Sequence, residues 1–220
     1  MLMYRYNYTN FLVMCSFICT FANEFKIFSA MKQRDYLEWI EAENIIEHLI
    51  EDKHYKMGLF VLIGFMTGMR ANDILALHWK DIMSGGILYK ESSTDRYYQV
   101  NFSDETEEKV NKIYQELGKP SLEEHCFISK KKCVYSIQRI NVLLKQVSQD
   151  YLRGEVLFTT STLRRTFGRE YLKRAGMSSL NTLGVFFNQD SEEFTMNYLR
   201  LYSNTLISLP RLCAVIRKQE

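Results

Sequence analysis

Two arginines and one tyrosine, Arg70, Arg164 and Tyr198, have side chains that together suit chemistry at a phosphorus centre. A guanidinium can bind two phosphoryl oxygens at once, and it stabilises negative charge that develops on them. A tyrosine hydroxyl can act as a nucleophile. Taken alone, each residue has an ordinary structural role: Asp73, three residues after Arg70, predicts an ion pair, and Tyr198 can pack under the C-terminal tail. The surrounding sequence must therefore distinguish chemistry from structure.

Three stretches in a fixed order surround these residues. The first runs from Thr67 to Ile82 (TGMRANDILALHWKDI), the second from Ser161 to Gly168 (STLRRTFG), and the third joins FNQDS at Phe187 to Ser191 with TMNY ending at Tyr198. In order, they resemble the boxes T-G-L-R-x-S-E-L-x-x-L-x-W-x-D-I, H-x-L-R-[HKR]-T-F, and F-N-H-S-S followed by T-x-x-Y of the tyrosine recombinases. The resemblance covers residues 31 to 202, and the sequence is similar to the catalytic domain of this DNA integrase class.

The resemblance implies both a fold and a chemistry. The fold is mainly α-helical with a small antiparallel β-sheet. Arg70 and Arg164 would bind the nonbridging oxygens of a phosphodiester, and Tyr198 would attack it to form a 3′-phosphotyrosyl intermediate that conserves the bond energy for rejoining. The positive field of the arginines would ease loss of the tyrosine proton. Double-stranded DNA is the implied partner, with no metal or nucleotide cofactor. Tyr202, one helical turn further on, is the alternative nucleophile.

Three other positions depart from the family pattern. Ser161 stands where the family has a histidine, and Gln189 stands where it has a histidine or tryptophan. The family also has a lysine in a β-hairpin that protonates the leaving 5′ oxygen. Ser93 stands at its position here, and Lys90 and Arg96 are the nearest cations in the sequence. Serine accepts no proton near neutral pH and arginine is a poor proton donor, whereas glutamine still donates a hydrogen bond. Losing general acid or base catalysis costs roughly 10²–10⁴-fold in rate per group, so we expect slow or absent catalysis.

The distribution of charge favours a polyanionic partner more than its total does. The net charge of +2 over 220 residues neither indicates nor excludes nucleic acid. Between residues 125 and 180, five lysines and six arginines stand against three acidic residues, a surplus of eight positive charges. We therefore predict weak, salt-sensitive and largely sequence-independent DNA contacts through this half of the chain. The predicted DNA-binding residues are Lys130, Lys131, Lys132, Arg139, Arg165, Arg169 and Lys173, together with Arg96.

The spacing of apolar residues predicts the elements that position these side chains. Residues 35–52 predict an amphipathic helix with Ile40 among its inward residues, and residues 57–69, apolar on nearly all sides, predict a helix at the centre of the core. Asn72 is the predicted cap of a third helix, 73–79, which places Arg70 in the turn between two helices. Residues 87–102 predict a β-hairpin with a polar turn at 92–96. Further helices are expected at 105–117, 137–151, 163–175, 180–187 and 192–202.

The sequence predicts one globular domain, residues 31–220, after a different N-terminal stretch. With 46% hydrophobic and 25% charged residues, the chain shows no compositional sign of disorder. Residues 11–22 are an apolar run too short to span a bilayer. We interpret residues 1–30 as an apolar appendage or an upstream translation start, with a membrane anchor as the alternative. The N-terminal core-binding domain that the family usually carries is expected to be absent, because only thirty residues precede Met31.

The cysteines indicate a reducing compartment. Five cysteines at irregular spacing form no disulfide framework, and we expect a cytoplasmic protein. His125, Cys126 and Cys133 are three residues of metal-binding type, but no fourth lies at a structural-zinc spacing, and small buried thiols are commoner. We expect no metal and, for residues 31–220, no membrane contact.

The tail after Tyr198 is apolar and interrupted by Pro210. We predict that it docks on a neighbouring protomer in DNA-bound assemblies, as the equivalent helix of the family often does, with packing on its own core as the alternative. Three functions stay open at this point: an active or weakly active strand-breaking and rejoining enzyme, an inactive recombinase-like DNA-binding or interaction domain from a mobile-element remnant, and a helical protein unrelated to DNA. Convergence of Arg70, Arg164 and Tyr198 would argue against the third.

Overall fold

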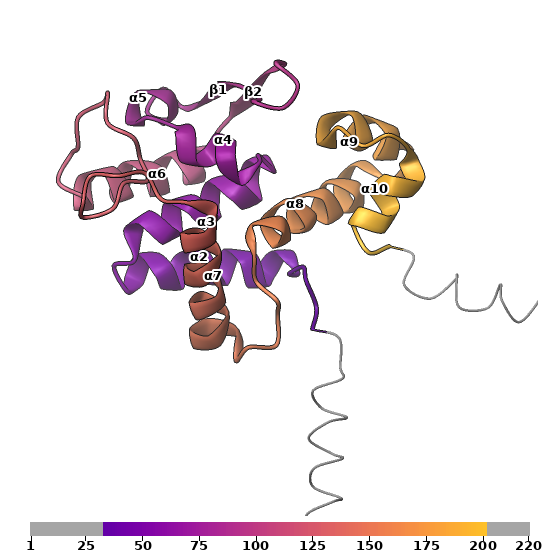
Figure 1. Ribbon diagram of the computed structural model, residues 1–220, viewed down its shortest axis with the longest axis horizontal. Coiled ribbons are helices and arrows are strands. Elements are labelled where there is room, and N and C mark those ends of the chain that lie inside the picture. The colour runs from indigo at the N-terminus through magenta and orange to yellow at the C-terminus, as the bar shows by residue number, and fades with distance from the viewer. Residues whose placement is uncertain (1–32, 202–220) are drawn as a thin grey trace, which may run out of the picture. The chain divides into compact units, whose positions relative to one another are not determined.

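The computed structural model describes residues 33–201 (Figure 1). The chain divides into two compact units, residues 1–34 and 35–220, and only Gln33 and Arg34 of the first are described. The helices and strands that the structure describes all lie in the second unit. The predictions for residues 1–30, for Tyr202 as nucleophile and for the apolar tail fall outside the described residues.

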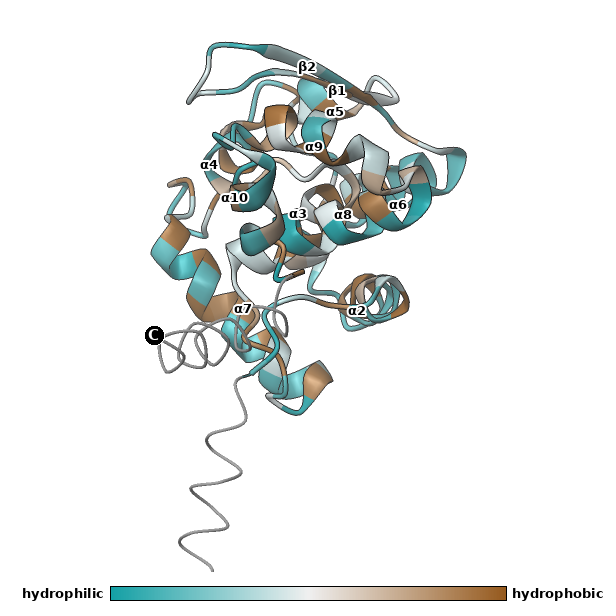
Figure 2. Ribbon diagram, turned by 90° about the vertical axis from the view of Figure 1, so that its right-hand side faces the viewer, coloured by the Kyte–Doolittle hydropathy of each residue, from teal (hydrophilic) through white to brown (hydrophobic). Residues whose placement is uncertain are grey.

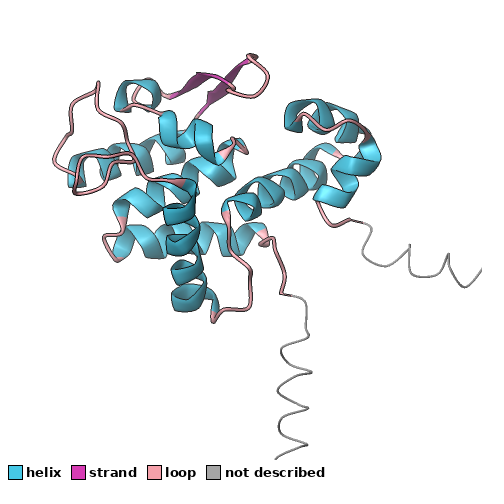
Figure 3. Cartoon of the chain, in the orientation of Figure 1, coloured by secondary structure: helices cyan, strands magenta, loops and turns pink. Residues whose placement is uncertain are grey.

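Within residues 35–201 the second unit is mainly helical, with one pair of strands (Figure 3). The predicted mainly α fold with a small antiparallel sheet is therefore confirmed. None of the described helices is long and apolar enough to cross a membrane. In chain order the elements are α2 (Trp39–Glu51), α3 (Tyr55–Thr67), α4 (Ala71–Ala76), α5 (Trp79–Ile82), β1 (Gly86–Lys90), β2 (Tyr97–Asn101), α6 (Asp104–Glu116), α7 (Ile137–Leu152), α8 (Thr160–Ala175), the 3-10 helix η1 (Met177–Ser179), α9 (Leu180–Phe187) and α10 (Glu192–Tyr198).

The apolar helix α3 forms the centre of the core, as its sequence predicts. Residues 59–63 are at most 1% exposed, because a helix that is apolar on all sides needs partners on all sides. Both α2 and α8 pack against it. The approach of α8 is close at Gly64, where an added Cβ would lie 2.6 Å from Leu163 Cδ1. This contact brings the end of α3, which leads into Arg70, beside the start of α8, which carries Arg164.

The two strands form the predicted hairpin. They pair antiparallel, with Gly86 opposite Asn101 and Lys90 opposite Tyr97, and the turn covers residues 91–96. Burial alternates along β1, so that Tyr89 is buried and Lys90 is exposed, as the two-residue period of a strand requires. The hairpin therefore presents one face to the core.

A second, smaller hydrophobic cluster holds the C-terminal helices together. It packs α9 and α10 on each other and on the C-terminal half of α8. Partly buried aromatic residues surround it, Tyr198 among them. The cluster therefore fixes the helix that ends at Tyr198. Its buried residues are Leu172, Leu180, Leu183, Phe187 and Leu199.

Three local predictions are wrong. Ile40 is 63% exposed, because it lies outside the helical stripe that buries Ile45 and Ile46. Asn72 lies inside α4 rather than at its cap, because Arg70 has the extended backbone of the N-cap position. The last predicted helix ends at Tyr198 rather than at residue 202, because the chain turns left-handed at Arg200 (φ 59°). By contrast, α7 shows the predicted amphipathic pattern, with apolar and polar residues alternating along it (Figure 2).

Candidate active site

Arg70 lies in the turn between α3 and α4, where the sequence predicts it. Its Nε donates to Oε1 of Glu91 at 2.9 Å, and its Nη2 donates to the carbonyl of Phe187 at 3.3 Å. The alternative structural role of Arg70, an ion pair with Asp73, is wrong. Asp73 is buried inside α4, and its Oδ1 accepts a hydrogen bond from the backbone N–H of Ser92 in the hairpin turn at 3.1 Å. The hairpin thus binds both the helix and the arginine that precedes it.

Arg164 is a buried cation that backbone carbonyls orient. It is 7% exposed in α8; its Nη1 donates to the carbonyl of Gly68 at 2.6 Å, and its Nη2 donates to that of Phe186 at 3.5 Å. Gly68 ends α3 with φ of +63°, which glycine adopts readily, and an added Cβ would collide with the Phe167 ring. Burial lowers the pKa of Arg164, but an arginine stays charged at neutral pH. The site therefore keeps a fixed positive charge.

Phe187 joins the two arginines to the tyrosine. The Cζ atom of Arg164 lies 4.2 Å from the centre of the Phe187 ring. The ring of Tyr198 packs edge-on against the same ring, with the centroids 5.7 Å apart. Because Arg70 binds the Phe187 carbonyl, residues from the α4 turn, α8 and α10 meet at the end of α9. Arg70, Arg164 and Tyr198 therefore all contact Phe187, although they lie far apart in the sequence.

Tyr198 is half-buried, and its environment acts on its pKa in both directions. Burial raises the pKa of the phenol, while the charges of Arg164, Arg165 and Arg70 lower it, and burial prevails. The expected easing of proton loss by the arginines is thus outweighed in the free protein. The phenol is protonated at neutral pH, and a nucleophilic role requires that it lose this proton as it attacks.

Two arginines of α8 bind the end of the tyrosine helix. Arg165 Nε donates to the carbonyl of Tyr198 at 2.9 Å, and its Cζ lies 5.0 Å from the centre of the Tyr198 ring. Arg169 Nη1 donates to the carbonyl of Leu199 at 2.9 Å. Arg165 also forms an ion pair with Asp35 at 3.0 Å. Both arginines therefore have internal partners, and their predicted contacts with DNA phosphates stay predictions.

A sequence profile of the phage integrase family matches residues 35–205. The chain belongs to the phage integrase family. The profile spans both arginines and the tyrosine, and it confirms the resemblance drawn from the three boxes. No curated protein matches the chain in sequence.

Solved structures of recombinases share the fold of this phage integrase family chain. The crystal structure of XerA recombinase has a TM-score of 0.59 and 18% identity, covering 77% of this chain and 60% of that one. XerH recombinase bound to palindromic difH substrate, a post-cleavage complex, has a TM-score of 0.57 and 21% identity, covering 77% and 50%. Tn1549 transposon integrase in complex with circular intermediate DNA has a TM-score of 0.51 and 19% identity, covering 77% and 62%. The match spans 50% to 62% of these proteins.

The positions that depart from the family pattern are placed as follows. Ser161 is exposed in the first turn of α8, and Gln189 is half-buried just after α9. Ser93 is exposed in the hairpin turn. Lys90 is exposed, and its Nζ forms an ion pair with Asp95 at 2.8 Å. The lysine nearest the family position thus binds a hairpin carboxylate, and the catalytic roles predicted for Ser161, Gln189 and Lys90 stay predictions.

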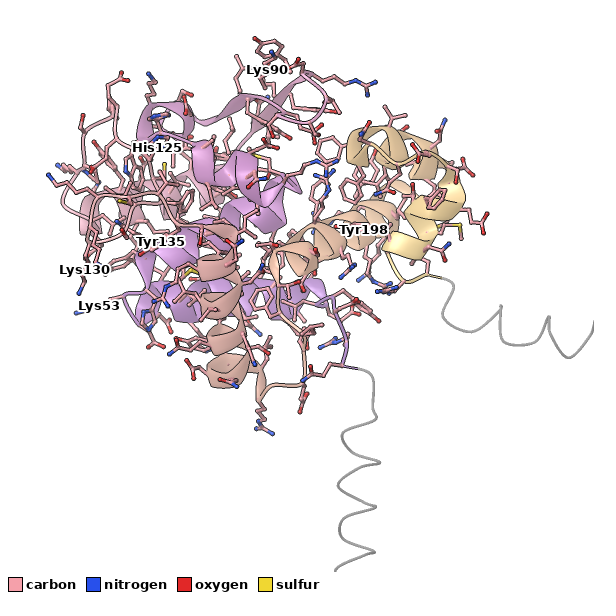
Figure 4. The ribbon with its side chains drawn as sticks, in the orientation of Figure 1. Lys53, Lys90, His125, Lys130, Tyr135 and Tyr198 are labelled. Carbon is pink, nitrogen blue, oxygen red and sulfur yellow. The ribbon has the colours of Figure 1, made fainter. Side chains whose placement is uncertain are left out.

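The predicted DNA-binding residues lie on more than one surface. Lys130, Lys131 and Lys132 are exposed in a turn that the bridge between Ile128 and Val134 closes. In the view of Figure 4, Lys130 and Lys90 lie at different edges of the domain, and both lie away from Tyr198. Arg139 and Lys173 are exposed on α7 and α8, and Arg96 is exposed in the hairpin turn. The positive surplus is therefore spread, and DNA contacts at these residues stay predictions.

His125, Cys126 and Cys133, the three residues of metal-binding type, do not form a cluster of possible metal ligands. In the described part of the chain, no three side chains of histidine, cysteine, aspartate or glutamate lie together as metal ligands would. Cys126 is buried and Cys133 is exposed.

Sequence reasoning missed Glu91, which contacts Arg70 directly. The signal was available in the strand period, because Glu91 continues the series Ile87 and Tyr89 and so falls on the inward side of the hairpin. A charged residue on the buried face of a strand is unusual unless it is paired. Here the partner of Glu91 is Arg70, the first arginine of the family pattern.

Proposed function

We propose that this phage integrase family chain binds duplex DNA and breaks and rejoins its strands through a 3′-phosphotyrosyl intermediate, as a site-specific recombinase or integrase. The observation that carries the proposal is the meeting of Arg70, Arg164 and Tyr198 around Phe187. The shared fold with XerH bound to difH substrate, and with Tn1549 integrase bound to DNA, supports duplex DNA as the partner.

The geometry suits transfer of a phosphodiester to tyrosine. Carbonyls of Gly68, Phe186 and Phe187 hold the two guanidiniums in place before any ligand binds, so little reorganisation is needed. In the proposed step the Tyr198 oxygen attacks phosphorus, the bond to the 5′ oxygen breaks, and the products are a 3′-phosphotyrosine and a 5′-hydroxyl. The arginines stabilise the negative charge that develops on the nonbridging oxygens. The reverse step rejoins a strand.

A second candidate function is an inactive recombinase-like domain of a mobile-element remnant that binds DNA or another partner. Two observations favour it. Burial raises the pKa of Tyr198 in spite of three nearby arginines. Lys90, the lysine nearest the family's proton-donor position, is exposed and paired with Asp95. Each feature slows attack or departure of the leaving group.

Covalent trapping on DNA distinguishes the two functions. A pool of random-sequence duplexes, each with a nick near its centre, loses a short strand on cleavage, so the covalent intermediate accumulates. We expect a protein–DNA product that survives denaturation with the wild type and is absent with Tyr198→Phe. Salt-sensitive binding of the same duplexes without any covalent product would support the inactive domain instead.

We propose that residues 31–220 form the catalytic-type domain, that it acts in the cytoplasm, and that the apolar tail docks in trans on a second DNA-bound copy. Light scattering with and without duplex, on the full chain and on a chain ending at Asn204, tests the tail. We expect DNA-dependent assembly of the full chain only. Unchanged stoichiometry on DNA, together with unfolding of the shorter free protein, would make the tail part of its own core.

A further inference from the structure

Glu91 is a buried carboxylate beside the candidate phosphate site, and the proposed chemistry so far gives it no role. It is 2% exposed. One oxygen accepts from Arg70 Nε at 2.9 Å, and the other accepts from the Thr94 hydroxyl at 2.7 Å. Its backbone N–H donates to the carbonyl of Arg96 at 2.8 Å, so the hairpin pairing fixes its place. The carboxylate therefore holds the arginine that would bind phosphate.

The charged and titratable groups that act on Glu91 come from the elements around it. Arg70 comes from the turn before α4, Arg164 from α8 and Tyr89 from β1. Burial, followed by the charges of Glu91 and Asp73, raises the pKa of Tyr89 well above its ordinary value. That phenol keeps its proton and the guanidiniums keep their charge, so Glu91 is the group of this set whose protonation a bound anion can change.

In the free protein Glu91 is an anion. Burial raises the pKa of its carboxyl, but hydrogen bonds from Thr94 and Arg70 and the charges of Arg70 and Arg164 outweigh burial, and the pKa lies below its ordinary value. A phosphodiester bound by the two arginines changes this balance. It brings a second negative charge beside the carboxylate and competes for the hydrogen bonds of Arg70. Because Arg70 is then shared between the two anions and the phosphate adds a like charge, the pKa of the carboxyl rises from its lowered value when phosphate binds, which favours uptake of a proton.

We propose that Glu91 is the general acid that protonates the leaving 5′ oxygen, a role that rests on the proposed strand cleavage. The Tyr198 oxygen forms its bond to phosphorus as the bond to the 5′ oxygen breaks. The Glu91 proton passes to that oxygen and leaves a 5′-hydroxyl, while the phenol proton passes to solvent. Glu91 returns to the carboxylate that Arg70 binds. In rejoining, the same carboxylate accepts the proton of the attacking 5′-hydroxyl.

Other groups of the hairpin fit this role less well. Ser93, at the position of the family lysine, is exposed and has no acidic proton near neutral pH. Lys90 is exposed and paired with Asp95 at 2.8 Å. Arg96 is exposed, and a guanidinium is a poor proton donor. Glu91 lies two residues before Ser93, and it is the one of these side chains whose contact with Arg70 the structure records.

The test combines Glu91→Gln with a substrate whose leaving group needs no proton. Glutamine keeps an oxygen for Arg70 but carries no exchangeable acid. The matched control is Glu108→Gln, the same exchange at an exposed side chain of α6. Each protein is assayed on a nicked duplex with an ordinary phosphodiester and on one with sulfur in place of the 5′ bridging oxygen, since a thiolate leaves without protonation.

We expect Glu91→Gln to lower the rate of covalent complex formation on the phosphodiester by roughly 10²-fold or more, the usual loss for a general acid. On the sulfur substrate it should react nearly as fast as the wild type, and Glu108→Gln should stay close to the wild type on both. An equal loss on both substrates would overturn the proposal by making Glu91 structural. An unchanged or increased rate on the phosphodiester would overturn it as well.

A binding measurement separates this inference from the proposed function. In a Tyr198→Phe background no attack occurs, yet phosphate binding should still add a proton to Glu91. Duplex affinity should therefore rise as pH falls through about 7 to 5, and it should rise less when Glu91→Gln is added; the four histidines are common to both proteins. Identical pH dependence would overturn proton uptake by Glu91. If the wild type forms no covalent product on either substrate while the two binding curves differ, strand cleavage is wrong but the carboxylate still meets the phosphate.

Discussion

The substitution Asp35→Asn probes how α10, the helix that ends at Tyr198, is held. The Asp35 carboxylate is 15% exposed and accepts from two arginines: Arg165, also 15% exposed, at 3.0 Å, and Arg200, 45% exposed, at 3.2 Å. Arg165 in turn donates to the carbonyl of Tyr198. Removing the charge at Asp35 therefore loosens the arginine that contacts both the backbone and the ring of Tyr198.

The magnitude follows from the exposure of the two pairs. A partly buried hydrogen bond between charged groups contributes about 1.5–3 kcal/mol. The more exposed Arg200 pair contributes about 0–1 kcal/mol. Asparagine retains one acceptor, so we expect a loss of about 2 kcal/mol in the free energy of unfolding, which lowers the melting temperature by roughly 4–8 °C for a domain of this size.

Thermal unfolding followed by circular dichroism measures this loss. The matched control is Arg174→Ala, which breaks an ion pair with Glu170 in which the arginine is 64% exposed, and which should cost less than about 1 kcal/mol. The pH dependence gives an independent readout. Asp35 raises the pKa of Tyr198, so Asp35→Asn should move the rising limb of covalent complex formation to lower pH. If Asp35→Asn melts at the same temperature as the control and leaves the limb in place, Asp35 does not hold Tyr198 in position.

Three further predictions address acidity, DNA binding and packing. Arg165→Gln removes a charge that lowers the pKa of Tyr198. In the pH profile of covalent complex formation, the rising limb should therefore lie at higher pH than in the wild type. A rising limb displaced to lower pH would contradict the electrostatic account. Replacing the three lysines of the exposed turn by glutamine (Lys130→Gln, Lys131→Gln, Lys132→Gln) should weaken DNA binding and reduce the salt slope by up to about 3, and an unchanged slope would place the phosphate contacts elsewhere. Gly64→Ala should lower the free energy of unfolding by about 1–3 kcal/mol, because the added methyl overpacks against Leu163. Gly58→Ala in the same helix is the control: its added Cβ would lie 3.4 Å from the nearest atom, so it should be neutral or stabilising. Equal effects of the two substitutions in denaturant unfolding would rule out the tight contact.

Local sequence patterns predict the elements of this domain better than the contacts between them. The all-apolar α3 and the alternating hairpin are confirmed because hydrophobic burial acts on patterns a few residues long. The predicted partner of Arg70 fails for the opposite reason. Asp73 is three residues away and Glu91 is 21, yet packing of the hairpin on α4 brings Glu91 to the guanidinium. The strand period places Glu91 on the inward face, but a local pattern does not say which distant residue it pairs with.

The three boxes locate the site, and packing determines its chemical details. Order and spacing of the boxes point to Arg70, Arg164 and Tyr198, and the fold brings them to Phe187. The positive field around Tyr198 is present as expected, but the extent of burial, which raises the phenol pKa above its ordinary value, depends on tertiary packing. Arg165 and Arg169 donate hydrogen bonds to backbone carbonyls at the end of α10, and this likewise depends on how α8 and α10 pack.

The most direct test of the account is to identify the residue that becomes linked to DNA. The covalent product from the nicked duplex is digested with protease and nuclease, and the modified peptide is sequenced by mass spectrometry. We predict a 3′-nucleotide on Tyr198, with no product from Arg70→Ala or Arg164→Ala under the same conditions. A nucleotide on any other residue, or a product whose yield is unaffected by loss of either arginine, would contradict a strand-cleaving site built from these three residues.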